Sequence, residues 1–266
     1  MTSFSRDAES SERSADQHLI RLLPYSEADG PHNMAADETL LESAVRGLAS
    51  LRFYGWSPPT LSLGYFQPER SRLEDPRLAA LPFVRRASGG DALIHHHEVT
   101  YALALPAGRP WQGADGWPQR MHRIIAAALE SFGIRANLHL FSRDAKSSER
   151  SAPFTGLRCF QHFTPGDVMV NGAKVVGSAQ RRQRGAILQH GGILLRASPH
   201  APMLPGIAEL TSRSLTAVEV CASVRHCFAL DTGWHVEPGP WTNVELGRIE
   251  ELAARKYSQD AWNRKR

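Results

Sequence analysis

The chain has 266 residues, of which 42% are hydrophobic and 22% charged, and a formal net charge of +4. This composition is ordinary for a soluble globular protein, and the length suits one or two domains. The apolar runs, such as 186–195, are too short and too polar to span a bilayer. Since no secretory signal opens the chain and its three cysteines are an odd count, we expect a cytoplasmic protein without a disulfide framework.

A polar segment occurs twice along the chain. Residues 1–17 offer almost nothing to bury and are predicted to be disordered. FSRDAESSERSA at 4–15 returns as FSRDAKSSERSA at 141–152, with Lys146 in place of Glu9. One near-copy does not make a repeat array. We expect a flexible polar insertion at about 141–155, inert or acting as a substrate gate, within a single domain over 18–266.

Helical and strand patterns alternate along this domain. Apolar spacing predicts helices at 33–49, 117–133, 214–230 and 241–258, with Gly133 ending the second. Strand patterns occupy 50–56, 60–67, 83–86, 92–96, 100–106, 166–170, 173–179 and 186–195. Strands joined by short turns, such as Asn171-Gly172, and flanked by helices indicate an α+β fold with a mixed, largely antiparallel sheet rather than repeating βαβ units.

The first stretch whose residues could bind a ligand or take part in catalysis is RRASGGDALIHHHEVTY at 85–101. Glycines after Ser88 let backbone amides approach a ligand oxygen, and Arg85 or Arg86 adds positive charge; a plain hairpin turn is the alternative. Three histidines follow at 95–97; if they continue a strand, His95 and His97 share one face and His96 points the other way. No neighbouring ligand set completes a metal site, so we expect His95 to be packed or hydrogen-bonded beside the turn.

The second stretch is GLRCFQHFTPGDVMVNGAKVVGSAQ at 156–180. A hairpin return would bring Lys174 near Cys159, and a nearby ammonium lowers the pKa of a thiol and favours the nucleophilic thiolate. The alternative for Cys159 is a buried packing residue, as we expect for Cys221 and Cys227 inside an apolar helix.

The third stretch, RRQRGAILQHGGILL at 181–195, combines a basic turn with a polar residue inside an apolar strand. Arg181, Arg182 and Arg184 are either a solvated turn or a surface for an acidic partner. His190 before two glycines suggests close approach of a ligand or of backbone.

Together these stretches resemble the biotin/lipoate protein ligase and octanoyltransferase superfamily. The matching pieces are HNMAADETLL, LSLGYFQ, RRASGGDALIHHHEVTYALALP, Cys159-Phe160, KVVGSAQRRQRGAILQHGGILL and KYSQDAWNRKR. They cover nearly everything from residue 18 onward apart from the insertion. Two positions depart from the family pattern: Asp91 stands where a third glycine is common, and His96 where an aspartate is common. An acidic side chain at 91 disfavours an anionic adenylate nearby, if it faces the pocket.

The resemblance implies an octanoyltransferase whose Cys-Phe pair and lysine correspond to Cys159-Phe160 and Lys174. It moves an octanoyl group from octanoyl-acyl-carrier protein through a Cys159 thioester to a lysine of a lipoyl domain, in 2-oxoacid dehydrogenases or the glycine-cleavage H protein, without cofactor, metal or membrane. The predicted binding residues are Arg86, Ser88, Gly89, Gly90, His95, Gly177, Ser178, Ala179, His190 and Gly191. Leu63, Tyr65, Val84 and Ile193 are candidates for an acyl tunnel, or plain core.

Two other functions stay open. An ATP-dependent lipoate or octanoate ligase would use ATP and Mg²⁺, with Lys174 on the phosphate and Cys159 incidental. A non-catalytic relative would bind carrier protein or nucleic acid. Nucleic acid is disfavoured because no DNA-binding motif accompanies the mild positive charge.

Overall fold

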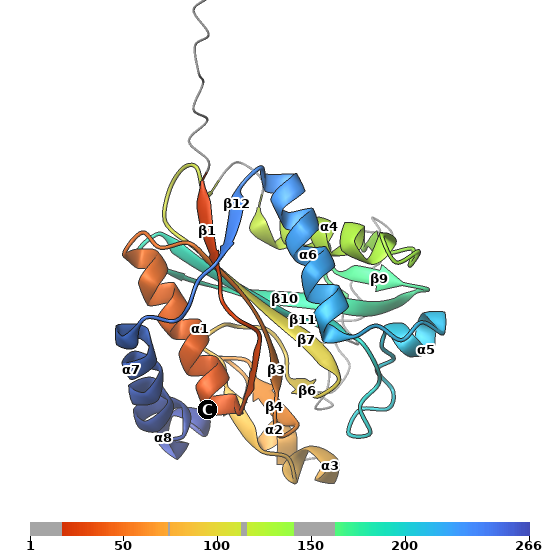
Figure 1. The fold of residues 1–266 in the computed structure, drawn as a ribbon. Coiled ribbons are helices and arrows are strands. Elements are labelled where there is room, and N and C mark those ends of the chain that lie inside the picture. Colours follow the sequence, from red (N-terminus) through yellow and green to blue (C-terminus); the bar gives the residue numbers. More distant parts are fainter. Residues whose placement is uncertain (1–17, 74, 113–115, 141–162) are drawn as a thin grey trace, which may run out of the picture.

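The computed structural model describes residues 18–73, 75–112, 116–140 and 163–266. Both copies of the repeated polar segment, the predicted insertion and Cys159 lie outside these residues. The described strands form a nine-stranded mixed sheet and a three-stranded sheet (Figure 1). The α+β prediction is confirmed, with a mostly antiparallel main sheet and helices on both faces.

The main sheet runs in the order β12-β1-β3-β7-β11-β10-β9-β8, with β2 also paired to β3. Pairing is parallel among β12, β1, β3 and β2 and antiparallel from β3 to β8. The strand bounds are β1 Leu19–Leu22, β2 Ser26–Ala28, β3 Ser50–Trp56, β7 Glu98–Leu105, β8 Asn137–Leu138, β9 Val168–Val170, β10 Ala173–Gln183, β11 Ala186–Leu194 and β12 His235–Pro238.

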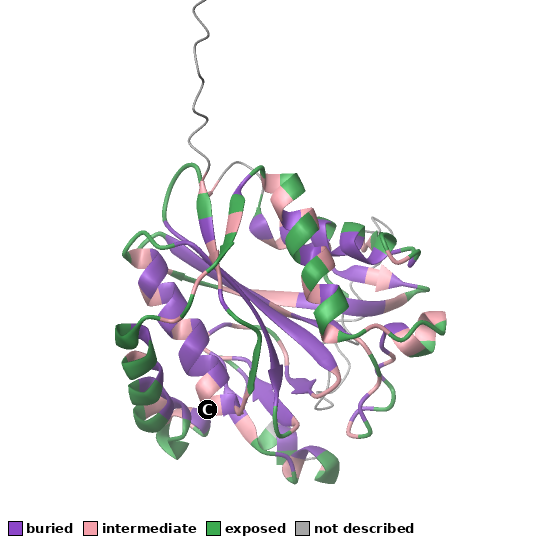
Figure 2. Cartoon of the chain, viewed as in Figure 1, coloured by how far each residue is buried: buried purple, intermediate pink, exposed green. Residues whose placement is uncertain are grey.

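Helices cover both faces of this sheet. On one face, α4 (Trp117–Glu130) and α6 (Ala217–Thr232) pack over the larger core, which includes Leu103, Ile125 and Phe228. On the other, α1 (Gly30–Val45) lies against β11 and β7 and is itself covered by α7 (Asn243–Leu252) and a π-helical turn, Ala253–Tyr257. Figure 2 shows the central strands and the inner side of α1 buried while the outer turns of α7 are exposed. Strands β3, β7 and β11 therefore have no water-facing side.

The small sheet has the order β5-β4-β6, with bounds β4 Thr60–Leu63, β5 Phe83–Arg85 and β6 Leu93–His95. Leu61, Leu63 and Leu78 lie in its own apolar cluster, and the C-terminal helix α8 (Asp260–Asn263) packs against β5. The remaining short helices are α2 Arg70–Leu73, α3 Pro76–Ala79 and α5 Ile207–Thr211.

The predicted elements occur with shifted ends, and the shifts have local causes. Helix α1 begins at Gly30 rather than 33 because the Asp29 side chain caps it and Pro31 occupies its first turn. Strand β4 stops at Leu63, before the predicted end at 67. The helix predicted at 241–258 consists of α7 and the π-helical turn, and the short helix α8 follows it beyond the predicted end. Strands β1, β2 and β12 and helices α2, α3 and α5 escaped prediction because they are short and weakly patterned.

Two smaller sequence predictions can also be compared with the described residues. Asn171 and Gly172 both have positive φ, as the predicted tight turn between β9 and β10 requires. Cys221 and Cys227 are half-buried in α6, and burial raises the pKa of Cys221 to about 12. Among the helices of the described ranges, none is long and apolar enough to cross a membrane.

Candidate active site

A pocket opens between the small sheet, α1 and the facing strands β10 and β11. We call it the apolar pocket; it encloses about 440 Å³, part of it open to solvent. Met34, Tyr54, Trp56 and Leu93 supply its large walls. Gly177 of β10 and Gly191 and Gly192 of β11 line its sheet side.

Most predicted binding residues gather at this pocket. The ones that line it are Arg86, Gly90, His95, Gly177, Ser178, Ala179, His190 and Gly191. Gly89 lies beside the pocket in the same turn, and its carbonyl oxygen accepts a hydrogen bond from Arg86 at 3.1 Å. Ser88 lines a second pocket described below. Segments about 100 residues apart in the sequence therefore meet at one place.

The turn at 88–91 is held by close backbone approach and by Arg86. A Cβ on Gly64 would stand 1.8 Å from the carbonyl oxygen of Gly90, so no side chain fits there. Arg86 Nη2 donates to the carbonyls of Gly89 (3.1 Å) and Asp91 (2.9 Å). Arg85, the other predicted cation, is fully buried and donates to backbone carbonyls, so its role is structural.

His95 belongs to a buried chain of polar groups at the pocket wall. Arg86 Nη1 donates to Ser62 Oγ (2.6 Å), Ser62 Oγ lies 2.6 Å from His95 Nε2, and Glu98 contacts His95 Nδ1. The ring stacks on Trp56 at 3.7 Å between centroids. Burial lowers the pKa of His95, although Glu98 acts in the opposite direction, so the ring stays neutral at neutral pH.

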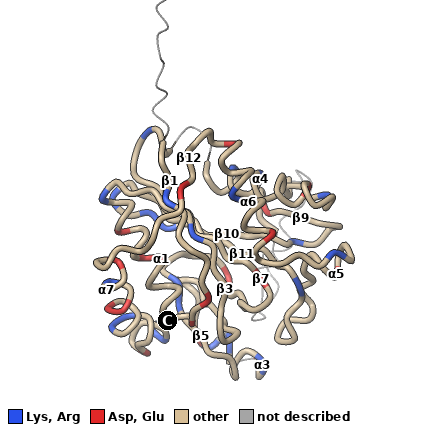
Figure 3. Tube along the Cα trace, in the orientation of Figure 1, with Lys and Arg blue, Asp and Glu red and all other residues tan. Residues whose placement is uncertain are grey.

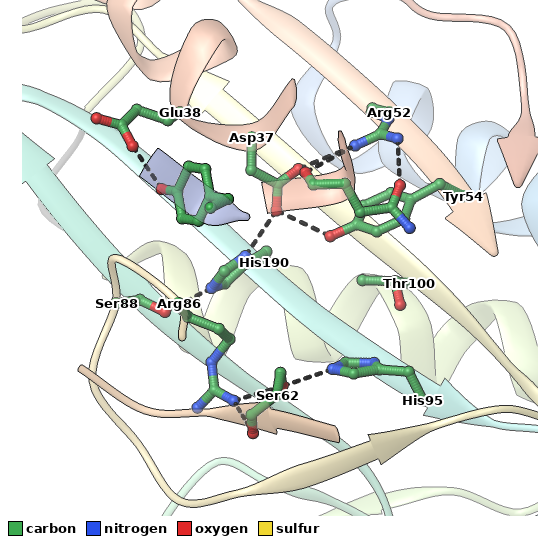
Figure 4. Close-up of polar contacts among 12 residues, drawn as sticks. Asp37, Glu38, Arg52, Tyr54, Ser62, Arg86, Ser88, His95, Thr100 and His190 are labelled. Atoms are coloured by element: carbon green, nitrogen blue, oxygen red, sulfur yellow. Dashed lines mark hydrogen bonds and ion pairs between the residues drawn. The ribbon is translucent and has the colours of Figure 1, made fainter. Parts of the chain in front are cut away.

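A second chain joins Asp37, His190 and Ser88 (Figure 4). His190 Nδ1 lies 2.7 Å from Asp37 Oδ2, and His190 Nε2 lies 2.6 Å from Ser88 Oγ. Asp37 also accepts from Tyr54 Oη at 2.8 Å and from Arg52 Nη1 at 3.2 Å. Burial first, and Asp37 second, raise the pKa of Tyr54 well above its usual value, so the phenol remains a donor. All these side chains are buried.

Lys174 lies under the β10 side of the apolar pocket. Its ammonium pairs with Asp167 at 2.7 Å, and both side chains are about 5% exposed. A Cβ on Gly177 would stand 2.6 Å from Lys174 Cε and 2.9 Å from Nζ. Glycine at 177 therefore makes the space in which the ammonium approaches the pocket wall. The predicted partner Cys159 lies outside the described residues, so its pairing with Lys174 stays a prediction.

A second pocket, the polar pocket, lies on the other side of His190. Ser88, Arg181, Lys256 and Trp262 line it, and it encloses about 450 Å³ including space open to solvent. Met34 and His190 line both pockets. Of the predicted basic turn, only Arg181 is among its lining residues; Arg182 and Arg184 are exposed. Figure 3 shows basic and acidic residues interspersed along the chain.

Three tunnel candidates are core residues instead. Leu63, Val84 and Ile193 are at most 1% exposed, belong to the apolar clusters, and are not among the residues that line the apolar pocket. Tyr65 lines the polar pocket. The three histidines do not continue one strand, since β6 ends at His95, and the rings of His96 and His97 stack at 3.6 Å between centroids. Among the described residues, no three His, Cys, Asp or Glu gather to hold a metal.

Several site residues escaped the sequence analysis. Asp37, Arg52, Tyr54, Ser62 and Glu98 carry the two polar chains. Only Asp37 had a usable signal, because it lies three residues after Met34 and four before Leu41 and so shares their buried face of α1. A carboxylate on such a face needs partners. Arg52 and Tyr54 are strand residues whose partners come from elsewhere in the chain.

The chain shares its fold with solved lipoate protein ligases. A lipoate-protein ligase A bound with ATP superposes with a TM-score of 0.70 at 19% identity, covering 93% of this chain and 98% of that one. An archaeal bipartite lipoate protein ligase of Thermoplasma acidophilum gives 0.68 at 20% identity, over 93% of this chain and 96% of that one. At such identities the likeness concerns the fold alone.

Sequence relatives and a family model narrow the class. The model of the lipoyl protein ligase A/B catalytic domain matches residues 29–221, and the chain belongs to this family. Octanoyltransferase LipM of Kyrpidia tusciae is 35% identical over 91% of this chain and 97% of its own length. Octanoyltransferase LipM of Bacillus subtilis is 30% identical over 92% of this chain and 98% of its own.

Proposed function

We propose that this chain is an octanoyltransferase that moves an octanoyl group from octanoyl-acyl-carrier protein to a lysine of a lipoyl domain in the cytoplasm. The observation that carries the proposal is the near full-length similarity to octanoyltransferases, at 30–35% identity. The apolar pocket beside Lys174 suits it, since aromatic and aliphatic side chains supply its large walls.

In the first half-reaction the Cys159 thiolate attacks the thioester carbonyl of the donor. The carbon–sulfur bond to the phosphopantetheine arm breaks, and the octanoyl group becomes a thioester on Cys159. The Lys174 ammonium favours the thiolate through its charge. Backbone amides at 88–90 and 177–179 are the candidate donors to the oxyanion.

In the second half-reaction the amine of the acceptor lysine attacks this thioester, and the products are an amide and free Cys159. Dividing the transfer makes each step one displacement on a thioester. The acceptors are lipoyl domains of 2-oxoacid dehydrogenases or the glycine-cleavage H protein, and the exposed Arg181 to Arg184 turn offers an acidic carrier protein a basic contact. The reaction needs neither ATP nor a metal ion.

The test is intact-protein mass spectrometry of the enzyme mixed with octanoyl-carrier protein, without ATP. We expect an octanoyl adduct on the wild type and none on Cys159→Ala. Cys221→Ala is the matched control and should form the full adduct, because burial raises the pKa of that thiol to about 12 and keeps it protonated. Full activity of Cys159→Ala with ATP and free octanoate would instead establish the ligase reaction.

A second measurement tests the role of Lys174. The pH dependence of Cys159 alkylation should shift upward in Lys174→Ala, because loss of the cation raises the apparent pKa of the thiol. An unchanged alkylation profile would remove Lys174 from thiolate stabilisation.

A further inference from the structure

We infer that the polar pocket receives the phosphopantetheine arm of the octanoyl donor, and that a cationic cluster of Arg181, Lys265 and Arg266 binds the phosphodiester of that arm. The inference rests on the proposed octanoyl transfer and names the route by which its donor enters. It assigns a ligand to the second pocket, and it gives two cations near the C-terminus a role in donor binding that the sequence did not suggest.

The two pockets follow one face of the neighbouring strands β10 and β11 (Figure 1). Residues paired across two strands share a face, and every second residue along a strand returns to it. Three successive pairs occupy this face: Gly177 with Gly192, Ala179 with His190, and Arg181 with Leu188. The first two pairs line the apolar pocket, whereas His190 and the third pair line the polar pocket. A linear ligand that extends along this face from Gly177 to Arg181, about 13 Å, therefore passes from one pocket into the other.

The cationic cluster lies around one aromatic ring of the polar pocket. The ring of Tyr65 lines this pocket. From its centroid, Lys265 Nζ lies 3.8 Å away, Arg266 Cζ 5.0 Å and Arg181 Cζ 6.0 Å. Positive charge gathered within so small a region suits one compact anion, such as a phosphodiester, better than carboxylates dispersed over a protein surface. The cluster therefore matches the single anionic group of the donor's arm.

Neighbouring carboxylates do not cancel the charge of this cluster. Among the residues that the structure describes, no aspartate or glutamate side chain forms an ion pair with any of its three cations. The two acids that line the polar pocket are paired with other cations, Glu38 with Lys256 at 2.6 Å and Asp37 with Arg52 at 3.2 Å. A phosphate group at the cluster would therefore meet a net positive charge.

Aromatic rings hold two cations of the cluster in place. Lys265 Nζ lies 3.3 Å from the ring centroid of Trp262, and Arg266 Cζ lies 5.3 Å from that of Phe66. Such cation–π contacts restrict long, flexible side chains, so less conformational freedom remains to be lost when an anion binds. Trp262 also lines the polar pocket and donates to the Arg85 carbonyl at 2.8 Å, which fixes the cluster to the small sheet.

Other arginines of this region do not fit the role. Arg85 and Arg86 are buried and donate to backbone carbonyls. Arg182 and Arg184 are exposed and are not among the residues that line either pocket. Within the basic turn, Arg181 is therefore the residue placed to meet a ligand in the polar pocket.

The experiment compares two small donors that differ by one phosphate group, octanoyl-phosphopantetheine and octanoyl-pantetheine. Intact-protein mass spectrometry gives the second-order rate constant of octanoyl-enzyme formation with each donor. We expect the wild type to react at least about tenfold faster with the phosphorylated donor, since hydrogen bonds to charged groups contribute on that scale. In the double variant Lys265→Ala/Arg266→Ala this ratio should fall to about threefold or less, and Arg181→Gln should also lower it. The ratio is taken on one protein, so a loss that affects both donors equally cancels.

The matched control is Arg135→Ala/Arg225→Ala, which also removes two exposed positive charges but lines neither pocket. It should keep the wild-type ratio. Equal rates with both donors in the wild type, or an unchanged ratio in Lys265→Ala/Arg266→Ala, would overturn the phosphate site and leave octanoyl transfer standing.

A binding measurement separates this inference from the proposed function. Phosphopantetheine without an acyl group should bind the wild type in calorimetry and bind Lys265→Ala/Arg266→Ala at least about tenfold more weakly. Octanoyl transfer fails as a function if the wild type forms no octanoyl-enzyme with any donor, including octanoyl-carrier protein. The phosphate site fails if phosphopantetheine binds the wild type and the double variant equally, or binds neither.

Discussion

At the scale of single residues, the site depends on positions where atoms approach too closely for any side chain. Gly177 is one of these, because Lys174 occupies the space that a methyl group would need. The same reasoning applies to Gly64 against the Gly90 carbonyl. In both cases a glycine of one segment sets the position of a group in another.

Gly177→Ala should therefore impair octanoyl-enzyme formation. The new methyl group would displace Lys174 Nζ from the pocket wall, and a displacement of about 1 Å at a catalytic group costs on the order of 100-fold in rate. The measurement is the initial rate of adduct formation on Cys159. Gly247→Ala is the control, since nothing lies within 4 Å of a Cβ there and alanine suits its position in α7. Equal rates in both variants would contradict the requirement for glycine at 177.

At the scale of elements, α7 is fixed to α1 and β1 by one carboxylate. Glu245 accepts from Arg21 at 2.7 and 2.8 Å, from Ser43 at 2.8 Å and from the Thr242 backbone at 3.0 Å. Burial by itself raises the pKa of Glu245, but these hydrogen bonds lower it to about 2. Three elements distant in sequence therefore depend on one ionised side chain for their mutual position.

A lowered carboxyl pKa makes stability depend on acid in a predictable direction. The contribution of Glu245 is fully present above its usual pKa of 4.5 and is lost as the pH falls toward about 2. The size of this pKa shift limits the contribution of Glu245 to the free energy of unfolding to at most about 3 kcal/mol. Glu245→Gln should lower the free energy of unfolding at pH 7 and flatten its decline below pH 5. Urea unfolding as a function of pH tests this.

The control for that experiment is Asp260→Asn. Asp260 pairs with Arg264 on the surface, where its side chain is 77% exposed, and such pairs contribute little. We expect this variant to keep the wild-type decline in acid. If the free energy of unfolding of Glu245→Gln declined in acid as steeply as that of the wild type, other carboxylates would be responsible for the acid sensitivity.

At the scale of the whole molecule, the C-terminal segment closes the small sheet and forms a wall of the polar pocket. Asn263 Oδ1 accepts from the Arg85 backbone at 2.9 Å, and its Nδ2 donates to the Tyr257 carbonyl at 2.7 Å. Trp262 lines the polar pocket and donates to the Arg85 carbonyl at 2.8 Å. The last residues of the chain thus complete the site begun by α1.

Asn263→Ala should destabilise the fold by about 1–3 kcal/mol, because it leaves the buried Arg85 amide and the Tyr257 carbonyl without their partners. Urea unfolding at neutral pH measures the loss. Asn243→Ala is a suitable control, since Asn243 is exposed at the start of α7 and such substitutions change stability by less than about 0.5 kcal/mol. Equal stability of the two variants would contradict a structural role for Asn263.

The sequence by itself determined the fold class, the long elements and the family. Apolar periodicity fixes α1, α4, β7 and β11 because each buries a continuous face, and the glycine and lysine motifs carry the resemblance. The same motifs predicted most of the residues that line the apolar pocket, since a turn rich in glycine or a histidine in an apolar strand has few structural uses.

Only the tertiary structure decided which polar groups meet. Asp37 on α1, Ser88 in a turn and His190 on β11 lie far apart in the sequence, and no local pattern encodes their contact. Their meeting follows from the position of α1 on the sheet, which is set by the packing of the whole apolar core. For the same reason the sequence did not decide which face of a strand packs in the core and which could line a pocket. Leu63, Val84 and Ile193 were therefore candidates for a tunnel, and the structure places them in the core.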